Sequence, residues 1–173
     1  SPHCRRLDRG GGVAVAARLS PLELGSDIGG SVRNPAHYNG IFSLKPTEWR
    51  VPGHGHVPDI PGLTRTVRYM GTFGPLARSV DDLDLALRLI AGPDGREAEG
   101  APVPLEPTPK LSAKGLRIAV LGSNPLVPVS ADTAAVVQAT AKLLSKAGAK
   151  VKHAEPAGLD WQQAWDDWSD LFQ

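Results

Sequence analysis

The clearest hydrophobic pattern follows Ser79, where apolar residues recur every three or four positions as far as Ile90. This spacing places them on one face of a helix. Ser79 and Asp82 have the form of a capping box, with Asp in place of the usual Glu, and Gly92-Pro93 ends the apolar run. The pattern predicts a helix over residues 79–91.

A strand–helix–strand pattern lies further along the chain. Residues 116–121 form an almost continuous apolar run between two glycines, which predicts a strand. Ser130 suits the N-cap of a helix that reaches Ala147, and residues 149–153 predict a second strand. A helix between two such strands is typical of the crossover in a parallel sheet, so an α/β fold is expected.

The remaining segments carry weaker patterns. Residues 13–19 are compatible with a short helix or a short strand, residues 21–25 predict a short strand, and residues 41–44 form a short apolar segment. Residues 51–74 and 92–115 have no hydrophobic period and contain many prolines and glycines. Both are therefore expected to be extended loops.

Three tryptophans share one face of a helix that is expected after residue 160. Trp161, Trp165 and Trp168 are spaced by four and then three residues. In a whole protein such a face favours a core position over a binding surface. In a piece of a domain the same face would lack its partner.

Composition excludes several classes of protein. Nineteen Lys and Arg against 18 Asp and Glu leave a net charge of +1, which gives no basic surface for nucleic acid or anionic membrane. No run of 18 apolar residues is present, and the single cysteine, Cys4, excludes an internal disulfide or a cysteine metal cluster. The 19 glycines and 16 prolines predict extensive loops.

The start of the sequence supports two further expectations. It opens at Ser1 rather than Met, which indicates a processed or truncated product. No signal-peptide pattern is visible, so a cytoplasmic location is expected.

The segment that indicates chemistry is residues 25–36, Gly-Ser-Asp-Ile-Gly-Gly-Ser-Val-Arg-Asn-Pro-Ala. Gly29 and Gly30 allow backbone conformations that are closed to other residues, so that consecutive N–H groups can converge on one point. Ser31 follows them as a candidate nucleophile next to donors for an oxyanion. For a bare Gly-Gly-Ser the alternative is an ordinary turn between strand and helix.

The complete segment resembles the second serine motif of the amidase signature family. The resemblance continues through residues 40–47, Gly-Ile-Phe-Ser-Leu-Lys-Pro-Thr, and through residues 74–83 and 90–94. It spans roughly residues 11–154. Members of this family hydrolyse amide bonds with a Ser–cis-Ser–Lys triad. The resemblance implies an α/β fold with a mixed β-sheet flanked by helices, of which residues 1–173 form an incomplete single domain.

The resemblance also implies roles for individual residues. Ser31 is the nucleophile that becomes acylated, Asp27 and Arg33 brace the loop, and Lys45 belongs to a structural block rather than to the triad. The oxyanion hole consists of the backbone N–H groups of Ile28, Gly29, Gly30 and Ser31. No cofactor is implied, and the expected substrate is a small-molecule amide.

The other two triad members depart from the family pattern. Ungapped alignment places the bridging serine at Leu7, within Arg-Arg-Leu-Asp-Arg-Gly, where the family has a Gly-Gly-Ser-Ser-Gly-Gly type of motif. The catalytic lysine precedes that motif in the family and is absent here. Without this relay nothing obvious deprotonates Ser31, so the chain alone is expected to be inactive.

The aberrant residues 1–10 have two explanations. The codons CGG CGG CTC GAC CGG GGN, one synonymous choice for residues 5–10, give Gly-Gly-Ser-Thr-Gly when they are read one nucleotide later, in register with Leu7. This suggests a frameshift or a sequencing error. The alternative is natural divergence.

Histidines offer no strong substitute for the missing relay. His54 and His56 are two residues apart, but no third metal ligand is close in sequence, so no metal site is expected. A dyad of Ser31 with His37 is less plausible still.

Two alternatives to an amidase remain open. One is a non-catalytic remnant that keeps the anion-hole loop, and the other is the amidase subunit of a tRNA-dependent amidotransferase. Neither a nucleic-acid nor a membrane partner is expected for an amidase. The oligomeric state cannot be read from the sequence.

Overall fold

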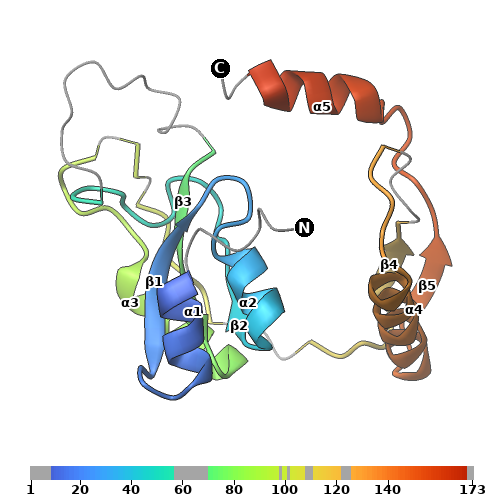
Figure 1. Cartoon of the computed structure of the whole chain (residues 1–173), viewed down its shortest axis with the longest axis horizontal. Helices are drawn as coiled ribbons and strands as arrows, with labels where there is room; N and C mark the ends of the chain where they lie inside the picture. The colour runs from blue at the N-terminus through green and yellow to red at the C-terminus, as the bar shows by residue number, and fades with distance from the viewer. Residues whose placement is uncertain are drawn as a thin grey trace. The chain divides into compact units, whose positions relative to one another are not determined.

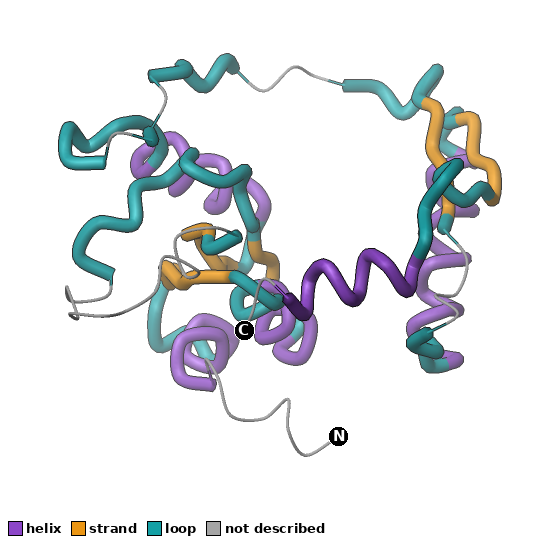
Figure 2. Tube along the Cα trace, turned by 90° about the horizontal axis from the view of Figure 1, so that it is seen from above, coloured by secondary structure: helices purple, strands orange, loops and turns teal. Residues whose placement is uncertain are grey.

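The computed structural model describes residues 9–56, 70–97, 99–100, 102–107, 111–121 and 126–170. The chain divides into two compact units, Ser1–Glu106 and Pro107–Gln173, and each is described by itself. No helix in the described part is long and apolar enough to cross a membrane. Loops make up much of the chain, as the glycine and proline content predicts (Figure 2).

The first unit is built around a three-stranded antiparallel sheet (Figure 1). Strand β3 (Thr72–Ala77) lies between β1 (Leu22–Asp27) and β2 (Phe42–Ser43). The register of β1 with β3 runs from Leu22 opposite Ala77 to Asp27 opposite Thr72. The carboxyl end of β1 therefore lies beside the first residue of the central strand.

Three helices accompany this sheet: α1 (Arg9–Ala16), α2 (Arg33–Asn39) and α3 (Val80–Ile90). Of the two readings of residues 13–19, the helix is correct up to Ala16. The helix predicted over residues 79–91 is confirmed, and its cap forms as expected, because the Ser79 hydroxyl accepts from the Asp82 N–H at 3.1 Å. Val32, Ala36 and Leu76 form a buried cluster in which α2 contacts the sheet, and Ile41 packs against it.

The second unit begins with the predicted crossover. Strands β4 (Arg117–Val120) and β5 (Lys150–His153) pair in parallel, and α4 (Ala131–Lys146) connects them. The buried side of this unit includes Val120, Ala141 and Ala149. Helix α5 (Trp161–Asp170) follows. Together with the antiparallel first unit, the parallel pair gives the mixed α/β fold that the sequence predicts.

One expectation about the fold is wrong. Residues 51–74 were expected to be loop throughout, whereas the central strand β3 begins at Thr72. Gly74 and Pro75 usually interrupt strands, and for that reason the segment was expected to be loop. Here they allow the chain next to β2 to lie close to β3. A Cβ at Gly74 would overlap the carbonyl oxygen of Leu44. Pro75 has no N–H to donate, but its carbonyl accepts from the Leu44 N–H at 3.0 Å.

The tryptophan face of α5 is not buried within its unit. Trp165 is 51% exposed and Trp168 is 37% exposed. This exposure agrees with the expectation for a piece of a domain, in which the face lacks its partner. The connection over residues 92–115 contains no helix or strand where the structure describes it, as expected.

Candidate functional site

The loop that carries Ser31 joins the end of β1 to the start of α2. It is fixed at its far end by Val32, which is fully buried. The Val32 side chain reaches back over β1 because Gly25 has no side chain, since a Cβ at Gly25 would lie 3.0 Å from Val32 Cγ1. The half-buried Ser31 thus lies directly before a residue anchored in the core. Sequence reasoning did not assign this role to Gly25, although a glycine inside a strand is a signal for close approach.

The near end of the loop is fixed by Asp27, which is also fully buried. Its carboxylate accepts hydrogen bonds from three backbone N–H groups of the same loop. The distances are 2.7 Å from Gly30, 3.2 Å from Val32 and 3.3 Å from Arg33. One side chain therefore determines the path of the backbone on both sides of Ser31.

Arg33 closes this arrangement from the solvent side. Its guanidinium donates twice to the Asp27 carboxylate, from Nε at 2.9 Å and from Nη2 at 2.8 Å, while the arginine side chain stays 52% exposed. This two-point geometry is the strong form of an arginine–carboxylate pair. We call the paired side chains of Asp27 and Arg33 the brace.

The brace keeps Asp27 ionised. Burial by itself raises the pKa of this carboxyl group, but the hydrogen bonds from the Arg33 side chain and from the backbone N–H groups of Gly30, Arg33 and Val32 outweigh burial and lower the pKa to about 2. The hydrogen bond to Asp27 raises the pKa of Arg33 in turn. At neutral pH the brace is therefore a fixed ion pair.

Gly30 has the backbone conformation that the loop requires, with φ of 117°. A Cβ there would also lie 2.7 Å from Asn34 Nδ2. The N–H of Gly30, one of the four expected oxyanion donors, is directed at Asp27. The other three belong to the half-buried Ile28, the exposed Gly29 and Ser31. Within the described residues, none of these three N–H groups has a hydrogen-bond partner.

Within the described ranges, no side chain is hydrogen-bonded to the Ser31 hydroxyl. Leu7, the position aligned with the bridging serine, lies outside the described residues, as does Cys4. Lys45 is half-buried and lies two residues beyond β2.

Two of the described histidines make edge-on aromatic contacts. The His37 ring meets Tyr38 edge-on, with ring centroids 5.2 Å apart, and His56 meets Phe73 in the same way at 4.8 Å. Phe73 is opposite Ser26 in the register, so its side chain is on the sheet face away from Gly25 and Val32. In the part of the chain that the structure describes, no three His, Cys, Asp or Glu residues are grouped to hold a metal ion.

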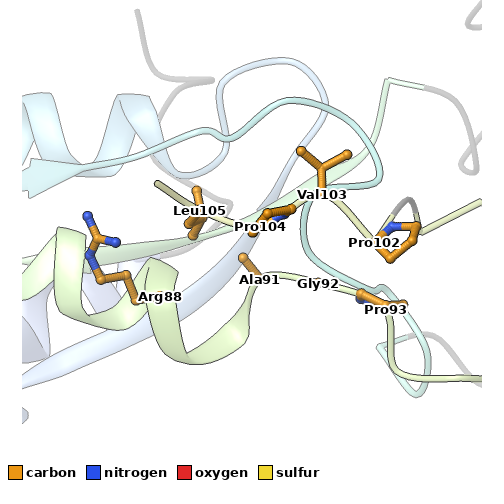
Figure 3. A pocket seen from close by; sticks show the side chains of 8 residues that line it. All are labelled: Arg88, Ala91, Gly92, Pro93, Pro102, Val103, Pro104 and Leu105. Atoms are coloured by element: carbon orange, nitrogen blue, oxygen red, sulfur yellow. The ribbon is translucent and has the colours of Figure 1, made fainter. Parts of the chain in front are cut away.

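A hollow of about 410 Å³ lies apart from the Ser31 loop, between the end of α3 and the segment 102–105 (Figure 3). At one end of it, Arg88 donates to Asp84 at 2.8 Å and to the carbonyl oxygen of Glu106 at 3.4 Å. No residue of the loop 27–33 contributes to its wall. The lining residues are Arg88, Ala91, Gly92, Pro93, Pro102, Val103, Pro104 and Leu105.

Comparisons with known proteins agree on one family. The family model described as Amidase matches residues 9–165. A glutamyl-tRNA(Gln) amidotransferase subunit from Deinococcus deserti is 43% identical over 114 residues, which are 65% of this chain and 22% of that protein. Indoleacetamide hydrolase from Bradyrhizobium diazoefficiens is 34% identical over 172 residues, which are 98% of this chain and 31% of that protein.

Solved structures show the same relationship. Fatty acid amide hydrolase matches with a TM-score of 0.82 and 30% identity, over 94% of this chain and 28% of that one. A 6-aminohexanoate cyclic dimer hydrolase in complex with substrate matches with a TM-score of 0.73 and 30% identity, over 92% and 33% of the two chains. The chain therefore spans about a third or less of the length of these relatives.

Proposed function

Because this chain belongs to the amidase family, we propose that it carries the nucleophile-bearing part of an amide hydrolase, with Ser31 as the nucleophile. The observation that supports this most directly is the fixed loop. Asp27 and Val32 anchor the backbone on either side of Ser31, so the hydroxyl is held in one place beside N–H groups that remain available to a ligand. Preorganised donors next to a nucleophile are what acyl transfer requires.

The proposed reaction proceeds in two steps. The Ser31 oxygen attacks the carbonyl carbon of a small-molecule amide, and the carbonyl oxygen becomes an oxyanion that accepts from the N–H groups of Ile28, Gly29 and Ser31. The C–N bond then breaks, ammonia or an amine leaves with a proton, and water hydrolyses the ester on Ser31. Gly30 supports the loop through Asp27 instead of donating to the oxyanion. These steps need no cofactor.

The hydroxyl proton of Ser31 still needs an acceptor. The family's bridging serine has Leu7 at its aligned position, and the family's lysine has no counterpart in this sequence. We therefore propose that residues 1–173 alone do not turn over an amide, and that the loop becomes competent when the rest of an amidase domain supplies the serine and the lysine. The coding sequence of residues 1–12 decides whether the Gly-Gly-Ser-Thr-Gly motif exists in the shifted frame.

A chimera tests the proposal directly. Residues 11–154 of this chain would replace the matching segment of the Bradyrhizobium diazoefficiens indoleacetamide hydrolase, which retains its own upstream residues. We expect the chimera to react with a fluorophosphonate probe and to hydrolyse indoleacetamide. Ser31→Ala should abolish both, while Ser26→Ala, a half-buried serine on β1, should retain both. A folded chimera that reacts no more than its Ser31→Ala variant would instead support the non-catalytic remnant.

The second candidate function is that of an amidotransferase component. It is favoured by the 43% identity to the glutamyl-tRNA(Gln) amidotransferase protein of Deinococcus deserti. A matching chimera in that protein separates the two candidates. Activity of the first chimera on indoleacetamide without any companion protein supports a stand-alone amidase, whereas activity only in the second chimera with its companion proteins supports the amidotransferase.

The proposal also includes a cellular location and a class of partner. We place the activity in the cytoplasm, with a small-molecule amide as the partner and neither nucleic acid nor membrane. Fractionation of cells that express the tagged chain tests the location.

A further inference from the structure

Asn34, the second residue of α2, places its side-chain amide against the loop that carries Ser31. A Cβ added at Gly30 would lie 2.7 Å from Asn34 Nδ2 and 3.2 Å from Asn34 Oδ1, so the amide lies over the glycine. The Asn34 N–H donates to the Gly30 carbonyl oxygen at 2.7 Å, which fixes the backbone from which this side chain extends. The absence of a side chain at Gly30 therefore leaves room for the Asn34 amide next to the proposed nucleophile.

Ser31 and Asn34 belong to one turn of the chain. Val32, between them, has helical backbone angles, with φ of −93° and ψ of −36°, and the bond from Asn34 to Gly30 has the spacing of a helical hydrogen bond. Residues three positions apart on such a turn have Cβ atoms roughly 5–6 Å apart. A side chain at the start of a helix also leans toward the preceding turn, which here contains residues 30 and 31. The Asn34 amide is thus a near neighbour of Ser31.

Asn34 is also the polar side chain of this loop that the brace and the proposed reaction leave unused. The brace engages both of its own side chains, and Ser31 is the proposed nucleophile. Asn34 is exposed, and among the described residues its side-chain amide has no hydrogen-bond partner. By contrast, Asn39, the other asparagine of α2, donates to a carbonyl oxygen of its own helix at 2.8 Å. The hydrogen-bonding capacity of Asn34 is therefore available to a ligand.

The loop has open space for such a ligand. Gly29 is exposed, and a Cβ added to it would have no described atom within 4 Å apart from its chain neighbours. An asparagine amide offers an NH₂ donor and a carbonyl acceptor, so it can bind a hydroxyl or an amino group. A site with such a polar group discriminates against an analogue that lacks the matching group, because the polar group is then left unpaired.

We propose that Asn34 is a specificity-determining residue that selects amides with a hydroxyl or amino group on the carbon next to the scissile carbonyl. This inference rests on the proposed function, because it places the substrate's carbonyl carbon at the Ser31 oxygen. A substituent on the neighbouring carbon is then two bonds from the reacting centre, within reach of a side chain on the same turn as Ser31. Asn34 takes no part in bond breaking and orients the substrate through this one hydrogen bond.

Two substrates of the same shape test the proposal in the chimera with indoleacetamide hydrolase. Lactamide has a hydroxyl group where isobutyramide has a methyl group. We expect a higher kcat/KM for lactamide, and Asn34→Leu should lower the lactamide-to-isobutyramide ratio of kcat/KM about tenfold, because the hydroxyl then faces an apolar side chain. Asn34→Gln keeps the amide and should retain part of the preference. His37→Leu, an exposed position one turn further along α2, is the matched control and should leave the ratio unchanged.

A second measurement uses the full chain without turnover and decides the case in which the chimera cleaves neither small amide. In ¹⁵N spectra, lactamide should shift the side-chain amide signals of Asn34 and the backbone signals of Gly29 and Ser31, whereas isobutyramide should shift the backbone signals alone.

The outcomes separate this inference from the proposed function. A ratio of kcat/KM that is the same with and without Asn34→Leu overturns the inference, and so does an Asn34 signal that fails to distinguish the two amides. Either result leaves Ser31 as the nucleophile if the chimera still hydrolyses indoleacetamide. A folded chimera that is no more active on indoleacetamide than its Ser31→Ala variant contradicts the proposed function itself.

Discussion

Asp27→Asn is the most informative single substitution in this chain because one carboxylate accepts five hydrogen bonds. Three come from backbone N–H groups and two from Arg33. An asparagine of the same shape keeps one acceptor oxygen but turns an NH₂ group toward donors. At least two donors then lose their partner, one of them the buried N–H of Gly30 or Val32, and the Arg33 guanidinium loses its countercharge.

The magnitude follows from this geometry. Each buried donor left without a partner costs about 1–3 kcal/mol, and breaking one side of a buried ion pair costs about 3–5 kcal/mol. Because the Arg33 side chain is 52% exposed and water replaces part of the lost interaction, we expect the lower end of that range, about 3 kcal/mol in the free energy of unfolding at pH 7.

The effect should depend on pH in a defined direction. The pKa of Asp27 falls from 3.8 to about 2 on folding, so the folded state favours the charged form. The charge therefore contributes its full stability above the unfolded pKa of 3.8, roughly 2 kcal/mol at 1.36 kcal/mol per pKa unit, and loses it as the pH falls through about 2. Near pH 3 about half of this charge contribution should remain, so the difference in unfolding free energy between the native chain and Asp27→Asn should narrow by about 1 kcal/mol.

Urea unfolding followed by Trp49 fluorescence measures this effect in the first unit. Replacing Trp161, Trp165 and Trp168 by Phe leaves Trp49 as the single tryptophan of the chain. Asp84→Asn is the matched control, because Asp84 pairs with Arg88 on an exposed helix surface and should contribute less than about 1 kcal/mol. Equal urea midpoints for Asp27→Asn and the native chain at pH 7, or a difference that does not change down to pH 3, would refute the reasoning.

Three further substitutions test the backbone of the same unit by the same assay. Arg18→Gly should raise the free energy of unfolding by about 1 kcal/mol, because the exposed Arg18 has φ of 63° just after α1, where glycine is favoured; an unchanged midpoint contradicts this. Gly74→Ala should lower it by about 1–3 kcal/mol because the new Cβ meets the Leu44 carbonyl, and a stability equal to the native one argues against the close approach of β2 and β3. Ser79→Ala should lower it by about 1 kcal/mol because the Asp82 N–H loses its cap, and a loss smaller than about 0.3 kcal/mol, below the usual range for caps, would exclude that role.

Local signals explain which parts of the fold could be predicted. Helix α3 has both a hydrophobic period and a capping pair, and β4, α4 and β5 follow each other along the chain, so their pairing needs no distant information. Strand β3 has neither advantage. By local rules its Gly74-Pro75 pair interrupts a strand. The pair is compatible with a strand because it lets β2, about 30 residues away in the sequence, approach closely. Local strand propensity therefore fails to predict β3, because a contact with a strand that is distant in the sequence determines its conformation.

The candidate site shows the same limit. The segment around Ser31 was found from its glycines and its resemblance to a family, and the roles of Asp27 and Arg33 came from that resemblance alone. The direction of the Gly30 N–H could not be predicted, because it depends on a buried carboxylate that accepts from three successive parts of one loop. The need for a glycine at position 25 also could not be predicted, because it depends on where Val32 packs.

The brace has a consequence for the chemistry of Ser31. A general base works best when its pKa lies near the working pH and when a lone pair faces the proton it takes. Asp27 meets neither condition, because its pKa is about 2 and five donors already occupy its oxygens. In the proposed reaction Asp27 therefore positions the loop, and another group accepts the Ser31 proton. In the chimera with indoleacetamide hydrolase, any acidic limb of the pH–rate profile near neutrality should therefore keep its pKa in Asp27→Asn, even if the rate falls. Loss of this limb in Asp27→Asn would assign the proton transfer to Asp27. It would contradict the interpretation that Asp27 only positions the loop.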